Sequence, residues 1–177
     1  MDSIQTRAAL AIAVAILAGC ATARSDTTSV TIAEPFDEAS AIAQMRAGTS
    51  SLKGSALLRK QNGGVVTCAG FEAMLVPATA YARARVRAIY GNESGGLNSA
   101  DARRNPTFTP NPPAYSQLTQ KTGCDAQGSF AFKSITGGDF YVVAPVIWKT
   151  SSGEQGGILS KLVTLREGEA KEIVLTQ

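Results

Sequence analysis

Residues 128–144 read GSFAFKSITGGDFYVVA, and this stretch decides the expected fold. Phe130 and Phe132 alternate with small or polar residues, so a strand through them places both rings on one face. The glycine pair at 137–138 is a turn signal, and a second, more apolar run containing Phe140 follows it. The stretch therefore predicts two consecutive β-strands joined by a tight turn.

Similar short runs lie on both sides of this stretch. The expected strands are residues 52–59, 65–68, 71–76, 128–133, 139–148, 158–165 and 171–176. Further turns are expected at Gly63-Gly64, at Gly156-Gly157 and at Glu167-Gly168-Glu169. Pro145 indicates an edge position or a bulge within its strand. Several short strands at this spacing predict a mostly β chain that folds as an antiparallel β-sandwich.

Residues 128–144, together with the strands expected within residues 54–77, resemble the carboxypeptidase regulatory-like, or transthyretin-like, domains. The shared pattern is a glycine turn, an alternating aromatic strand, a second glycine turn and a further aromatic strand. The resemblance implies an Ig-like sandwich of transthyretin-like topology that serves as a non-catalytic module in an exported protein. The glycines and aromatics that carry it define the fold, so the resemblance transfers no active-site residue.

Two segments differ from this strand pattern. Asp37 and Gly48 predict the start and the end of a short N-terminal helix. Residues 79–122 form an insertion between the two halves of the sandwich. Its first part, residues 79–90, fits either a helix or a strand of alternating side chains, and its alanine content favours the helix. Glycines and four prolines then predict a long loop without extended regular structure.

The N-terminus has the features of a secretory signal peptide over residues 1–19. Arg7 precedes an uncharged apolar run, residues 8–17, which is too short to span a bilayer. The motif that follows, Leu17-Ala18-Gly19-Cys20, resembles the lipobox of bacterial lipoproteins. This resemblance implies that Cys20 is lipidated and, because Ala21 follows it, that the protein is anchored in the outer membrane. We expect the domain to face the periplasm, although the sequence leaves a surface-exposed orientation open. More than one acyl chain makes such an anchor stable.

The rest of the chain divides into a flexible tether, residues 20–33, and one domain, residues 34–177, which is long enough to bury a sizeable core. Cys68 and Cys124 are left as an even pair after Cys20, and export to an oxidising compartment predicts a disulfide between them. The alternatives are two separate buried thiols or a redox pair, although no Cys-x-x-Cys spacing supports the latter.

Several classes of chemistry lack the residues that they need. The chain contains no histidine, which removes Ser-His-Asp and Cys-His catalysis and makes a zinc site improbable. The glycine-rich motifs of nucleotide-binding proteins are absent. The net charge of +3 is modest and does not provide the dense basic surface that a nucleic-acid-binding protein needs. We therefore expect no catalytic residue, no cofactor, no metal and no nucleic-acid partner.

Two groups of residues could still bind or react. The candidate binding residues of the insertion are Arg83, Arg85, Arg87, Arg103, Arg104, Tyr81 and Tyr90. They could recognise anionic groups of an envelope polymer or protein, or the arginines could form an ordinary solvated face. The candidate acid/base residues are Glu93, Asp101, Asp125 and Asp139. A position in turns beside glycines explains Asp125 and Asp139 more simply.

The sequence thus predicts a membrane-anchored envelope lipoprotein whose sandwich is a non-catalytic binding or structural module. Its expected partners are the membrane, through the N-terminal lipid, and an envelope polymer or envelope protein, through the insertion. The alternative is a carboxylate-based hydrolase that acts on cell-wall glycans. Buried, pKa-perturbed carboxylates in a cleft would favour the enzyme, whereas an open aromatic or basic surface would favour binding.

Overall fold

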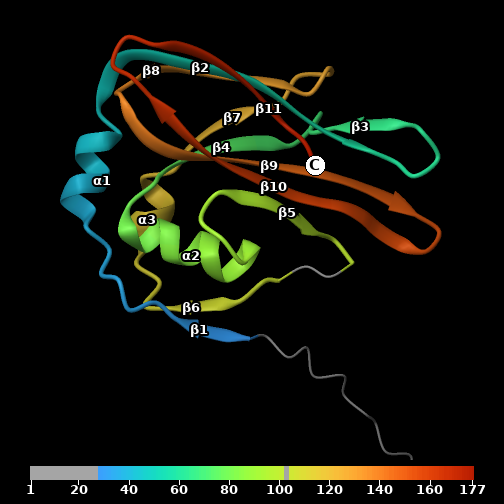
Figure 1. Cartoon of the computed structure of the whole chain (residues 1–177), viewed down its shortest axis with the longest axis horizontal. Coiled ribbons are helices and arrows are strands. Elements are labelled where there is room, and N and C mark those ends of the chain that lie inside the picture. The colour runs from blue at the N-terminus through green and yellow to red at the C-terminus, as the bar shows by residue number, and fades with distance from the viewer. Residues whose placement is uncertain (1–27, 102–103) are drawn as a thin grey trace, which may run out of the picture.

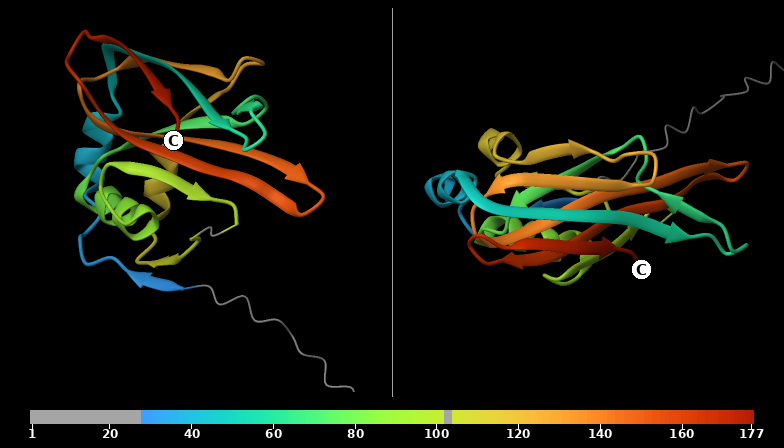
Figure 2. Two further views of the ribbon diagram at one scale, coloured as in Figure 1. Left: turned by 45° about the vertical axis from the view of Figure 1, so that its right-hand side comes forward. Right: turned by 90° about the horizontal axis from the view of Figure 1, so that it is seen from above.

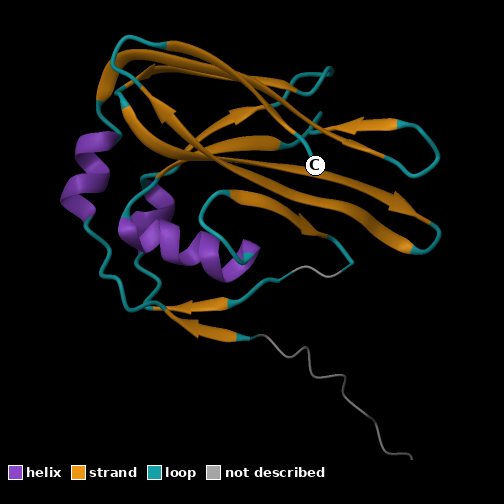
Figure 3. Ribbon diagram, in the orientation of Figure 1, coloured by secondary structure: helices purple, strands orange, loops and turns teal. Residues whose placement is uncertain are grey.

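A computed structural model describes residues 28–101 and 104–177 (Figures 1 and 3). The predicted signal peptide, Cys20 and Arg103 lie outside the described residues. The strands are β1 (Ser29–Thr31), β2 (Ala47–Arg59), β3 (Val65–Thr67), β4 (Glu72–Pro77), β5 (Gly95–Ser99), β6 (Thr107–Thr109), β7 (Gln120–Gly123), β8 (Ser129–Ile135), β9 (Gly138–Thr150), β10 (Gly153–Leu165) and β11 (Ala170–Leu175). The helices are α1 (Glu38–Gln44), α2 (Ala80–Tyr90) and α3 (Pro113–Gln117).

The strands form two facing sheets, which confirms the predicted mostly β, antiparallel sandwich (Figure 2). One sheet has the order β5-β10-β9-β4-β7 and is antiparallel throughout. In the other, β2 pairs with β8 and β3 in antiparallel fashion and with β11 in parallel. Helices α2 and α3 and the small β1-β6 pair lie beside the five-stranded sheet (Figure 1). Within the described ranges, none of the helices is long and apolar enough to cross a membrane.

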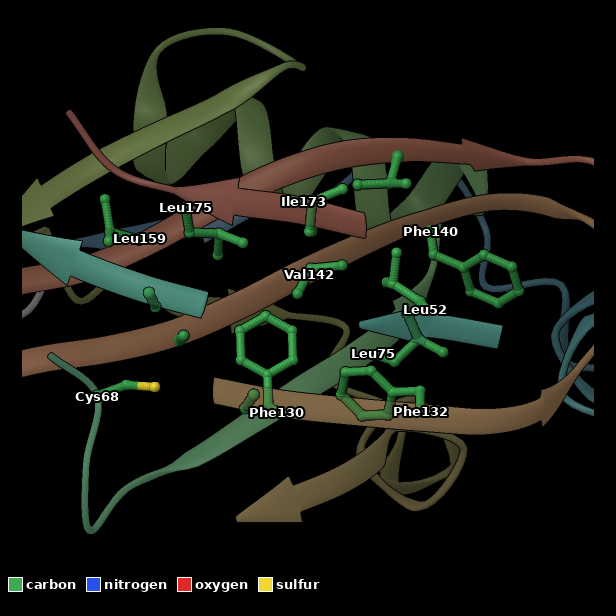
Figure 4. Close-up of a cluster of buried hydrophobic side chains, with 14 of the residues drawn as sticks. Leu52, Cys68, Leu75, Phe130, Phe132, Phe140, Val142, Leu159, Ile173 and Leu175 are labelled. Carbon is green, nitrogen blue, oxygen red and sulfur yellow. The ribbon is translucent and has the colours of Figure 1, made fainter. Parts of the chain in front are cut away.

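The core lies between the two sheets, where the decisive stretch places its rings as predicted. Phe130 and Phe132 on β8 are both buried, with ring centroids 5.9 Å apart, and they face Phe140 and Val142 of β9 (Figure 4). Burial of each of these side chains contributes about 1.5–3 kcal/mol to the stability of the fold. The alternation seen in the sequence is therefore the alternation of core and solvent faces.

The predicted disulfide is confirmed. Cys68 and Cys124 are bonded, with Cα atoms 5.8 Å apart, and Cys68 is fully buried in the core cluster. The amide of Cys124 also donates a hydrogen bond to the Phe71 carbonyl, with N and O 2.8 Å apart. The bridge therefore joins the chain just before β4 to the chain just after β7, with the whole insertion in the loop that it closes.

Helix α1 begins as predicted but ends earlier. The carboxylate of Asp37 accepts hydrogen bonds from the amide of Ser40 at 3.0 Å and from its hydroxyl at 2.6 Å, and these bonds lower the pKa of Asp37. The helix ends at Gln44, so the expectation that Gly48 caps it is wrong. Gly48 lies in β2, where a Cβ would come within 2.4 Å of the carbonyl oxygen of Ile135. Its small size serves strand pairing.

Two turn signals also have different outcomes. Gly63 lies in the turn between β2 and β3, as expected. The expected turn at Gly156-Gly157 is wrong, because both glycines lie inside β10, and the chain reverses at residues 151–152 instead. Pro145 pairs with Ile158 of β10, while the pairing of β9 with β4 ends at Val143. The proline therefore has the local edge position that was predicted.

The N-terminal boundary of the domain differs from the expected one. Residues 29–31, which were assigned to the tether, form β1 and pair in parallel with β6 of the insertion. Ile32 is buried, and its amide donates to the Thr109 carbonyl at 2.9 Å. Phe36 packs edge-on against Tyr81, with ring centroids 5.6 Å apart. A three-residue segment is too short to show the alternation of apolar and polar residues that predicts a strand. Strand β1 is therefore recognised only from its pairing with β6.

Candidate functional site

The segment that was open between helix and strand is helix α2, as the alanine content indicated. The Thr79 side chain accepts from the amide of Ala82 at 3.3 Å, and Gly91 closes the helix with a φ of 78°. The helix is followed by β5, β6 and α3 in place of a structureless loop. It packs on the sandwich with Ala82 and Val86 buried against Tyr141 of β9. The insertion is therefore an integral part of the molecule.

Arg83 and Arg87 are held by carboxylates of the protein itself. A guanidinium nitrogen of Arg83 lies 2.7 Å from Asp139 Oδ2, and its Nε donates to the Ala78 carbonyl at 3.1 Å. Arg87 forms a hydrogen-bonded ion pair with Glu93, which raises its pKa, and a longer contact with Glu34 at 3.8 Å. These arginines connect α2 to neighbouring segments and leave little free positive charge for a partner.

Arg85 lies among aromatic rings. Its guanidinium carbon is 4.1 Å from the centroid of the Phe108 ring and 4.4 Å from that of Tyr115. It donates to the side chain of Asn111 at 2.8 Å and to the Tyr81 hydroxyl at 3.3 Å. Tyr81 itself is fully buried. Tyr81, a predicted binding residue, therefore belongs with Phe108 and Tyr115 to a second core, with Arg85 at its edge.

The remaining candidates of the insertion are separate from this cluster. Burial raises the pKa of Tyr90 to about 12, and its hydroxyl is 3.4 Å from the Ile158 carbonyl. Arg104 is exposed, and its backbone amide and carbonyl bond the side chain of Asn98. Arg87 and Arg104 are thus the exposed members of the predicted set among the described residues. Binding through these residues remains a prediction.

The carboxylates proposed for acid/base chemistry have structural partners. Asp125 accepts from the amides of Gln127 and Ser129, as a turn residue does, and Asp139 accepts from Arg83 and from the Thr164 hydroxyl. The shifted carboxyl pKa values, those of Asp37, Glu167 and Glu169, are lowered by hydrogen bonds, which is opposite to the shift that a general acid needs. The hydrolase alternative gains no support from these groups. Residues 28–101 and 104–177 contain no cluster of potential metal ligands either.

An open groove of about 710 Å³ lies at the end of the sandwich where the β2-β3 turn and the β9-β10 hairpin project (Figure 1). Its size is in the range of small-molecule sites. The turn contributes residues 59–62, the hairpin contributes Trp148, Lys149 and Gln155, and the end of β5 contributes Leu97 and Ser99. Both sheets therefore supply side chains to one concave surface, and most of these side chains are polar.

Trp148, the single tryptophan of the chain, is the aromatic surface of this groove. It is half-buried and lies across Gly156 of β10, whose φ is +85°. A Cβ at residue 156 would lie 2.6 Å from Cζ3 of the indole, so only glycine leaves room for the ring. Lys60 reaches over the indole from the β2-β3 turn, with Nζ 5.7 Å from the ring centroid. The indole is thus positioned from both sheets.

The sequence interpretation missed this site. Trp148 was counted as the last residue of an apolar strand, and Gly156 as part of a turn. One signal was present, because a lone tryptophan precedes the polar run Lys149-Thr150-Ser151-Ser152 at the end of a strand. An aromatic residue at the tip of a hairpin has less core to fill than one in mid-strand.

Comparisons with protein-family models and with curated proteins found no match to the chain. Among solved structures, the fold is similar to the crystal structure of a proposed carbohydrate-binding protein from Pseudomonas aeruginosa. The two chains are 25% identical, with a TM-score of 0.66, and the similarity covers 81% of this chain and 99% of that chain. The likeness therefore extends over most of this chain and nearly all of that one.

Proposed function

We propose that this chain is an envelope lipoprotein whose β-sandwich is a non-catalytic carbohydrate-binding module, with the groove around Trp148 as the saccharide site. The observation that carries the proposal is the indole, held half-exposed in an open polar groove. An aromatic ring offers a flat apolar surface for the C–H face of a sugar ring. The similar structure of a proposed carbohydrate-binding protein supports the same ligand class.

The polar lining of the groove suits the rest of a saccharide. Gln61, Asn62 and Gln155 carry amides, which both donate and accept hydrogen bonds, as sugar hydroxyls also do. These amides lie on the β2-β3 turn and on the β9-β10 hairpin, so they come from both sheets. Because the groove is open to solvent, a saccharide bound in it could continue into a longer chain. An envelope polysaccharide is accordingly the proposed ligand.

The test is a titration of the purified protein, solubilised in detergent, with oligosaccharides prepared from envelope polymers. Since Trp148 is the single tryptophan, its fluorescence reports on the groove directly, and calorimetry supplies an independent affinity. We expect Trp148→Ala to weaken binding at least about tenfold, which corresponds to about 1.4 kcal/mol. Trp148→Phe should retain part of the affinity, because it keeps an aromatic surface.

Phe71→Ala is the matched control. Phe71 is an aromatic residue with 38% of its surface exposed, and it does not line the groove. Its removal should leave saccharide affinity unchanged. If no oligosaccharide changes the fluorescence of Trp148 and calorimetry detects no binding, the proposed function is wrong. Equal loss of affinity in Trp148→Ala and Phe71→Ala would place the site elsewhere.

A further inference from the structure

We infer that the groove selects saccharides that carry an anionic substituent, and that Lys60 is the residue that recognises the charge. The inference rests on the proposed function and specifies the class of glycan. It begins from one contact, because the ammonium group of Lys60 lies 5.7 Å from the centroid of the Trp148 ring, so a sugar that contacts the indole comes close to this cation. A sugar bound there brings its ring substituents next to a positive charge.

The position of Lys60 is fixed by the backbone around it. Its amide donates to the Gly64 carbonyl at 2.7 Å, and its carbonyl accepts from the amide of Gly63 at 3.0 Å. The aliphatic part of its side chain runs beside Gly64, where a Cβ would lie 3.5 Å from Cδ of Lys60. The side chain is also half-buried. The turn therefore places the backbone of Lys60 within reach of the indole, and its side chain lies beside Gly64.

Two more cations line the same groove. Arg59 precedes Lys60 at the end of β2, and Lys149 follows Trp148 in β9. Asp101 and Glu154 also line it, and Glu154 lies opposite Lys149 in the pairing of β9 with β10, so Lys60 and Arg59 are the cations on which the inference depends. Hydrogen bonds from a cation to an anionic oxygen are roughly twice as strong as those between neutral groups. A carboxylate, sulfate or phosphate on the sugar consequently gains more at this site than a hydroxyl.

The experiment compares saccharides that differ only in charge. The probes are a short oligogalacturonate and the same oligomer with its carboxylates methyl-esterified, and binding is followed by Trp148 fluorescence and by calorimetry. We expect the acidic oligomer to bind about tenfold more tightly than the ester, and raised salt to reduce this preference. A phosphorylated monosaccharide and its unphosphorylated parent form a second pair, which shows whether carboxylate or phosphate is preferred.

Three variants assign the effect to Lys60. Lys60→Gln should bring the ratio of the two affinities close to one, and Lys60→Arg should keep the preference. Lys53→Gln is the control, because it removes the same charge from an exposed position of β2, the strand that leads into the turn of Lys60, outside the groove. Thermal unfolding checks that the variants fold.

The possible results separate the inference from the proposed function. Equal binding of the acidic oligomer and the ester by the wild-type protein, with no preference in the phosphorylated pair, would overturn the inference and leave a saccharide site in place. An acidic preference that survives in Lys60→Gln would overturn the role of Lys60. Absence of binding by every saccharide probe, those of the envelope polymers included, would overturn the proposed function itself.

Discussion

At the scale of single residues, the guanidinium of Arg85 packs at the edge of the aromatic core of the insertion. Its carbon lies 4.1 and 4.4 Å from the centroids of two rings, and its nitrogen donates to Asn111 and Tyr81. Partly desolvated cation–π contacts contribute about 2 kcal/mol, and hydrogen bonds add to this. Arg85 therefore stabilises the aromatic cluster, whereas the exposed ion pairs of Arg87 stabilise little.

We predict that Arg85→Ala lowers the free energy of unfolding by about 2 kcal/mol, because it removes the cation–π contacts and leaves the Tyr81 hydroxyl with one partner fewer. Urea denaturation of Arg85→Ala, Arg85→Lys and Arg87→Ala measures this, with Arg87→Ala expected to change stability little. Equal stability of Arg85→Ala and the wild type would contradict the structural role. Binding by the insertion is better tested at the exposed Arg87 and Arg104, because a change at Arg85 also affects folding.

At the scale of elements, two tyrosines link the insertion to its surroundings. Tyr90 ends α2 and contacts β10, and Tyr115 lies in α3 against the ring of Phe36, which precedes α1, with centroids 5.9 Å apart. Burial raises the pKa of each to about 12, while an unfolded tyrosine has a pKa of about 10. Above pH 10 the unfolded chain loses these protons before the folded one does. Stability is therefore retained below about pH 10 and falls between about pH 10 and 12.

The prediction is a measured loss of unfolding free energy across that window, accompanied by late appearance of tyrosinate absorbance in the folded protein. The double variant Tyr90→Phe/Tyr115→Phe should show a smaller loss, because neither ring can ionise. Lysines also titrate in this window, so the difference between the wild type and the variant is the quantity that counts. Identical pH profiles would mean that both hydroxyls reach water in the folded state.

How much of the fold could be predicted also depends on the element. The strands around residues 128–144 were predictable, because apolar and polar residues alternate there over enough positions to indicate a β-strand. Strand β1 has three residues and β6 has three, and each is defined only by the other, far away in the chain. The groove was missed for the same reason, because Trp148, Lys60 and Gly156 come from three strands or turns whose contact is a property of the tertiary structure.

At the scale of the whole molecule, the proposed lipid anchor can be tested directly. Cys20→Ser should yield an unlipidated protein, because a hydroxyl does not replace the thiol as acyl acceptor. Fractionation of cells and mass spectrometry of the N-terminus measure the outcome, and the variant should leave the membrane fraction. Acylated protein recovered from membranes of the Cys20→Ser strain would refute the lipobox interpretation. The substitution changes no residue of the sandwich, so we expect its thermal unfolding to stay unchanged.

The pairing of β1 with β6 has a mechanical consequence for a protein held at its N-terminus. Tension applied along the tether reaches the folded body first at Ser29, and a three-residue parallel pair with the buried Ile32 yields before the long strands of the sandwich do. Peeling off residues 28–36 lengthens the tether by about 30 Å. Tension that β1 passes to β6 enters a segment closed covalently by Cys68 and Cys124. With the proposed lipid anchor, extension would be taken up beside the membrane, and the groove proposed to bind a polymer would keep its shape.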